Sequence, residues 1–235
     1  MKKKSSRIFL PFFMAMMLLF TGTHMTAQKT RNVSDFSKIS IAISADVYLS
    51  QGDKESLCLE GDQDILEKIE TVVSGNTLQI KYKSSFFMPR KKNITVHLTA
   101  KDIDELNIAG SAELKAKTKI SAPEINFNIS GSGKIEIDEL ETNNIEASIS
   151  GSGDIILKGS KKLKNIDLSI SGSGKYIAPN LQTENIHASI SGSGKCEVYA
   201  SKKLTASVSG SGKAYYNGNP VVNAKISGSG NVSKK

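Results

Sequence analysis

The sequence predicts an all-β protein: a β-helix, or β-solenoid, with Gly-Ser-Gly corners, preceded by a mostly-β N-terminal part with one short helix. Two observations support this prediction. Ser-Gly-Ser-Gly occurs six times in the second half at steps of 18 to 21 residues, and a fixed repeat of this length is typical of a solenoid. Before each copy, apolar and polar residues alternate, which indicates a strand with one buried face.

Residues 1–27 have the three-part layout of a secretory signal peptide. A basic opening precedes an apolar run at 8–20 and a polar stretch that ends at Ala27. A retained membrane anchor is the alternative, but the apolar run has 13 residues where a bilayer span needs about 20. We therefore expect cleavage after Ala27 and an exported mature chain without a membrane span.

The net charge gives no reason to expect nucleic-acid binding. Lys and Arg exceed Asp and Glu by 31 to 23, but four of the positive charges lie in the first seven residues. The rest of the chain has 27 basic against 23 acidic residues, a balance of about +4. The 38% hydrophobic content argues against a disordered chain.

Residues 28–105 are expected to form an N-terminal β-rich domain. Short alternating runs predict its half-buried strands, which are Ile39–Ile43, Val47–Leu49, Leu57–Leu59, Leu78–Ile80, Ile94–Leu98 and Ile103–Ile108. The stretch at 84–92 combines apolar and basic residues. A hairpin end whose aromatic side chains fold back onto the sheet is the favoured interpretation, and a surface-contacting tip is the alternative.

One short helix is expected at 64–73. Ile65, Ile69 and Val72 have helical spacing, and Gly75 stands where a helix would end. The two acidic residues Asp64 and Glu67 could form a capping box at its start.

Residues 106–235 are expected to form the solenoid, with about seven coils of strand, corner and strand. A degenerate copy of the corner at 109–112 adds the seventh. Glycine permits a positive φ and lets one corner pass close over the next. The structural turn glycines are Gly131, Gly133, Gly151, Gly153, Gly172, Gly174, Gly192, Gly194, Gly210, Gly212, Gly228 and Gly230.

One column of outward-facing residues contains the sharpest candidate cluster in the sequence. Glu146, Asp167 and His187 occupy equivalent positions in three successive coils, which places neighbours about 5 Å apart. A metal or acid/base site is one interpretation. A solvated charge ladder is favoured, because metal sites need three or four convergent ligands and no second His or Cys is near.

Only two cysteines follow the signal peptide. A disulfide between Cys58 and Cys196 is permitted in an oxidising compartment, but two cysteines are too few for a disulfide framework that would hold the fold together. Buried free thiols are favoured, since Cys196 falls in an inward column.

The repeated Ile-Ser-Gly-Ser-Gly turns follow a segment with Gln51-Gly-Asp53, Glu60-Gly61 and Gly75-Asn-Thr-Leu78. In these residues the chain resembles the auto-transporter adhesin head domain, or head GIN domain, a family of exported proteins of Gram-negative bacteria. The resemblance spans almost the whole mature chain. It implies a β-helix similar to pectin-lyase-like folds, no established enzymatic site and a role in adhesion.

The leading hypothesis is a non-enzymatic exported module for cell-surface adhesion or binding, without a cofactor. A long face of Ser and Asn can hydrogen-bond a glycan or a host protein at low entropy cost. A polysaccharide-acting enzyme and a purely structural periplasmic module are the alternatives. Gly-Ser-Gly-Lys recurs four times, but no Ser or Thr follows the Lys as a P-loop requires.

The C-terminal coil is expected to self-associate. The segment 231–235 follows the last corner without a capping helix, so the apolar columns of that coil should be partly open. Lys234 and Lys235 oppose association, because edge lysines also keep strands apart.

Overall fold

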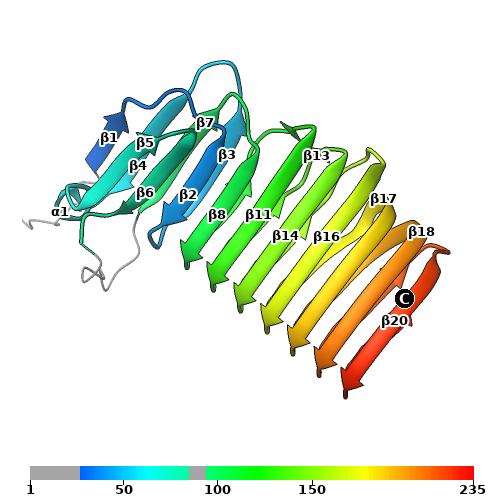
Figure 1. Ribbon diagram of the computed structural model, residues 1–235. Helices are drawn as coiled ribbons and strands as arrows, with labels where there is room; N and C mark the ends of the chain where they lie inside the picture. The colour runs from blue at the N-terminus through cyan, green and yellow to red at the C-terminus, as the bar shows by residue number, and fades with distance from the viewer. Residues whose placement is uncertain (1–26, 85–93) are drawn as a thin grey trace, which may run out of the picture.

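The computed structural model describes residues 27–84 and 94–235 as one elongated, nearly all-β body (Figure 1). Strands make up 70% of these described residues and helix 2%, in a solenoid of about six turns. Most of the expected signal peptide and of the loop at 84–92 lies outside the described residues. No helix within those ranges combines the length and apolar character needed to span a membrane.

Each coil of the repeat contributes two strands, one to each of two sheets. In Figure 1 the strands of the front sheet lie side by side from β8 to β20. They are β8 (Glu105–Gly110), β11 (Glu124–Gly131), β14 (Asn144–Gly151), β16 (Leu163–Gly172), β17 (Lys175–Gly192), β18 (Lys195–Gly210) and β20 (Val221–Gly228). The back sheet contains β9 (Glu113–Ala116), β12 (Lys134–Ile137), β15 (Asp154–Leu157), the first parts of β17 and β18, β19 (Lys213–Asn217) and β21 (Asn231–Lys234). Two short strands, β10 (Ile120–Ser121) and β13 (Leu140–Glu141), pair in the return loops.

The coils stack in parallel, and the residues of the apolar columns stand in register, as the columns predict; the β17–β18 pairing shifts register only between Ala178 and Asn185. Ile125 pairs with Ile145, which in turn pairs with Ile166, and the same alignment continues to Val222. These side chains are buried up to Leu204, and the intervening polar residues point outward. Because a single coil cannot cover its own apolar face, each coil is stabilised by the next.

The two glycines of a corner are required for different reasons. Gly172 has φ +121°, and a Cβ there would lie 2.4 Å from the carbonyl oxygen of Gly151 in the preceding coil. A Cβ at Gly174 would instead lie 2.4 Å from the Cγ2 of Ile149. The first glycine therefore permits both the turn and the close backbone contact, and the second leaves room for the isoleucine column.

The N-terminal part extends the same two sheets. Its strands are β1 (Ala27–Arg31), β2 (Lys38–Ala42), β3 (Asp46–Gln51), β4 (Ser56–Gly61), β5 (Ile69–Ser74), β6 (Thr77–Tyr82) and β7 (Thr95–Ala100). β2 and β3 pair in parallel with β8 and β9, whereas β4 and β5 pair antiparallel with β7 and β6. One hydrophobic core runs through both parts. The division into domains at residue 105 stays a prediction.

The expected helix at 64–73 is wrong in extent. The helix α1 is only Gln63–Leu66, and Asp62, not Asp64, precedes it without a side-chain capping bond. From Ile69 the chain forms β5, because the β-branched run through Val73 pairs with β6. Gly75, with φ +59°, lies in the turn between these two strands and does not end a helix.

Both cysteines are free thiols, as the favoured interpretation states. Cys196 is fully buried in its inward column, and this burial raises the pKa of its thiol to about 12. Cys58 is only half-buried, which corrects the expectation that both are buried. It lies beside His97 on the outer surface of the back sheet, since the inward positions of β4 belong to Leu57 and Leu59.

Candidate functional site

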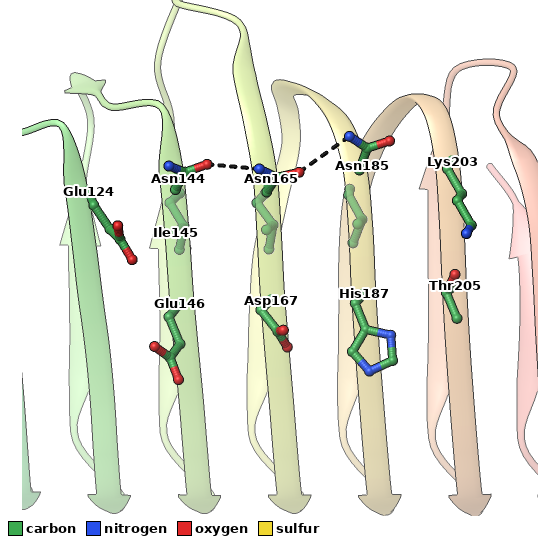
Figure 2. Close-up of a pocket in the computed structure, with 12 residues that line it drawn as sticks. Glu124, Asn144, Ile145, Glu146, Asn165, Asp167, Asn185, His187, Lys203 and Thr205 are labelled. Carbon is green, nitrogen blue, oxygen red and sulfur yellow. Dashed lines mark hydrogen bonds between the residues drawn. The ribbon is translucent and has the colours of Figure 1, made fainter.

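The outer surface of the front sheet carries a shallow groove of about 610 Å³ across strands β11 to β18 (Figure 2). Amide and charged side chains dominate its lining, with three inward-facing isoleucines beneath them. The groove is lined by Glu124, Asn144, Ile145, Glu146, Asn165, Ile166, Asp167, Asn185, Ile186, His187, Lys203 and Thr205. We name it the front groove.

Three asparagines form a hydrogen-bonded ladder along one edge of the front groove (Figure 2). Asn165 Nδ2 donates to Asn144 Oδ1 at 3.0 Å, and Asn185 Nδ2 donates to Asn165 Oδ1 at 3.2 Å. Strand register produces this ladder, because the three residues stand at equivalent positions of β14, β16 and β17. The amides are thereby held in one orientation, which lowers the entropy cost of binding a polar ligand.

The predicted trio lies in the same groove, one outward position along the strands. Glu146 is paired in register with Asp167, and Asp167 with His187. All three side chains are exposed and point away from the sheet surface (Figure 2). No group of three His, Cys, Asp or Glu side chains in the described ranges has the arrangement of a metal site. The interpretation of the trio as a solvated charge ladder stays a prediction.

Charge in the front groove is divided along the solenoid. Glu124, Glu146 and Asp167 lie toward its N-terminal side, whereas Lys203 extends toward Thr205 on its C-terminal side (Figure 2). Asp167 and Lys203 stand on strands separated by one intervening strand, so their rows are about 10 Å apart. The groove therefore offers acceptors at one end and a cationic donor at the other.

The back sheet differs from the front groove in that its charged side chains form ion pairs with one another. Glu197 lies 2.5 Å from Lys195 and 2.7 Å from Lys235, and Lys134 lies 2.8 Å from Glu136. Hydrogen bonds from these lysines lower the pKa of both glutamates. Across the described part of the chain, no ion pair involves Glu146, Asp167 or Lys203. The charges of the front groove are thus available to a ligand.

The sequence reasoning found the trio but missed the asparagine ladder and the ends of the groove at Glu124 and Lys203. A signal for the ladder was present. Asn directly precedes the isoleucine column in three successive coils, at Asn144, Asn165 and Asn185. The groove itself could not be read from the columns, because they show which residues face outward but not where the surface is hollow.

Parallel coils, glycine corners and a polar outer face define the chain as a β-solenoid with a surface groove and a continuous apolar core. The chain belongs to the family described as putative auto-transporter adhesin, head GIN domain, whose sequence profile matches residues 35–220. This confirms the resemblance found in the glycine turns and the N-terminal segment. No curated protein matches the sequence.

Solved structures share this fold over almost their whole length. A putative adhesin from Bacteroides fragilis is similar with a TM-score of 0.84 and 22% identity, covering 91% of this chain and 98% of that one. A putative lipid binding protein from Parabacteroides distasonis is similar with a TM-score of 0.71 and 27% identity, covering 89% and 96%. A putative adhesin from Parabacteroides distasonis has a TM-score of 0.67 and 24% identity, covering 91% and 98%. None of these names is that of an enzyme.

Proposed function

We propose that the chain is an exported, non-enzymatic binding module of the adhesin type, acting at the cell envelope or surface, and that the front groove holds its ligand. The asparagine ladder carries this proposal. It sets amide donors and acceptors in fixed orientation beside carboxylates and an imidazole that have no ion-pair partner in the described part of the chain. The family description and the names of two similar structures support an adhesion role.

A glycan or a hydroxyl-rich segment of a host protein fits this lining. The planar amides both donate and accept hydrogen bonds and the carboxylates accept them, which suits hydroxyl groups, since a hydroxyl also donates and accepts. The similar protein from Parabacteroides distasonis is named for lipid binding. The front groove favours a polar ligand over an acyl chain, because its rim consists of Asn, Glu, Asp, His and Lys side chains.

Binding screens of the purified chain against glycans and matrix proteins test the proposal. For any ligand found, Asn165→Ala and the double variant Glu146→Gln with Asp167→Asn should weaken binding at least tenfold, about 1.4 kcal/mol or more. Asp154→Asn is the matched control, because Asp154 faces outward on the back sheet and pairs with Lys175 at 3.6 Å. It should bind like the unchanged protein.

The two alternatives are separated by the same material. Release of sugar from a polysaccharide, abolished by changing Glu146, Asp167 or His187, would establish an enzyme instead. Blank binding screens at high protein concentration, together with protection of the chain from protease on intact cells, would favour a purely structural periplasmic module.

A further inference from the structure

The C-terminal coil differs from all earlier coils in the exposure of its inward columns. Val222 and Ile226 continue the columns of Leu204 and Val208, each of which is 1% exposed. In the last coil the exposed fractions rise to 37% for Val222 and 45% for Ile226. All eight residues of β20 are exposed, so the apolar surface that every earlier coil covers is open here.

The backbone of this coil also has unused hydrogen-bonding groups. In the described part of the chain, β20 pairs only with β18, and β21 only with β19. An edge strand of this kind is a template for a further strand. The opposite end of the solenoid differs in its apolar burial: α1 lies there beside β1 and β4, and its Leu66 and the neighbouring Ile69 are each 1% exposed. Among the described residues, β1 pairs only with β4 and β5 only with β6, but neither strand is a repeat coil with open inward columns.

We propose that the C-terminal coil is an interface through which two copies of this chain associate tail to tail. A two-fold axis relates the copies, so β20 of one protomer runs antiparallel to β20 of its partner. The existing β18–β20 contact shows that coils of this sequence pack on one another, and the dimer continues that stack by one further strand pair. Because both copies use the same edge in a two-fold contact, the association closes at two copies.

One register makes this edge self-complementary. With Ala224 opposite the partner's Ala224, Val222 faces the partner's Ile226, and Asn223 faces the partner's Lys225. Apolar side chains then meet on the inward face, and no lysine stands opposite a lysine within β20. The spacing of residues along an antiparallel pair requires these matches once the central pair is set.

The lysines that oppose association at the sequence level are engaged within their own protomer. Lys234 Nζ donates to Asn219 Oδ1 at 2.6 Å, and Lys235 Nζ lies 2.7 Å from Glu197 Oε2. Their charges are thereby held on the flank of the coil and away from the apolar edge of β20, which removes the main objection to pairing.

Sedimentation velocity of the purified chain from 1 µM to 1 mM tests the interface. The unchanged protein should form a dimer and no larger species. Val222→Asp combined with Ile226→Asp should raise the dissociation constant at least tenfold. Val72→Asp is the matched control: Val72 is also 37% exposed but lies on β5 near the other end, so its variant should dimerise normally.

Disulfide trapping tests the register. In a Cys58→Ser background, Ala224→Cys should give a covalent dimer on oxidation, because Cα atoms of directly opposed residues are about 4.5–5.5 Å apart. Asn223→Cys should not, since it faces the partner's Lys225. A monomer at every concentration, a dimer unaffected by the two Asp substitutions, an open-ended polymer, or preferential trapping at residue 223 would overturn the proposal. Circular dichroism checks that each variant is folded.

Discussion

The two parts of this solenoid build the same sheets with different sequence rules. In the repeat, each corner is Ser-Gly-Ser-Gly because the next corner passes directly over it, so one geometric requirement recurs in every coil. In the N-terminal part, turns are individual: Asp35 adopts φ +61°, and its amide donates to Glu55 Oε2 at 2.8 Å. Where similar coils stack, the same residues are required at the same position of every coil. Where strands are added in antiparallel pairs, each turn is stabilised by its own local contacts.

The largest difference in stability between the two parts should appear when their turn glycines are replaced by alanine. Gly172→Ala combines an unfavourable φ with a Cβ 2.4 Å from a backbone oxygen that cannot move independently. We expect a loss of about 4 kcal/mol or more in the free energy of unfolding. Gly75→Ala also has a positive φ, but nothing lies within 4 Å of its Cβ, so it should lose about 1 kcal/mol. Equal losses in urea unfolding would contradict the distinction.

A second experiment asks whether the two parts are one cooperative unit. Ile41 and Ile170 belong to a single row that runs through both parts in register, and each is 1% exposed. Truncation of either to alanine should cost about 3 kcal/mol, and both variants should unfold in one transition when followed by circular dichroism. If Ile41→Ala instead produces a separate early transition, the N-terminal part is an independent domain with its boundary near residue 105.

Tyr176 tests whether an inward column of the repeat tolerates a buried polar group. It fills an aliphatic column between Ile155 and Cys196, and its hydroxyl is buried without a hydrogen-bond partner among the described residues. Tyr176→Phe removes the unsatisfied group and keeps the ring, so we expect a gain of about 1 kcal/mol in thermal or urea unfolding. A loss of similar size would indicate that the hydroxyl is bonded to a buried water.

The smallest expected effect concerns charge on the back sheet. Lys195 and Lys235 hold the pKa of Glu197 below its ordinary value, so the ion pairs stabilise the folded state above the unfolded pKa of about 4.5. This contribution should disappear as the pH falls through the lowered folded pKa. Glu197→Gln should lose less than about 1 kcal/mol at pH 7, and its deficit should vanish at the acid end of a pH series. A deficit that persists there would point to packing instead of charge.

Much of the fold could be predicted from particular residues. The isoleucine columns and the glycine corners gave the strand register, the inward and outward faces, and the buried position of Cys196. The helix at 64–73 was overestimated because helical spacing of Ile65, Ile69 and Val72 coincides with a β-branched run, and local periodicity cannot weigh pairing with β6.

The candidate site divides in the same way. Sequence alone determined that Glu146, Asp167 and His187 stand on successive strands, because a repeat with fixed period brings equivalent positions side by side. Only the tertiary structure shows that the three asparagines hydrogen-bond to one another and that Lys203 lines the same groove. It also shows that lysines of the back sheet, such as Lys195, form ion pairs. The direction of each side chain determines these contacts, and the spacing of residues along the chain does not specify it.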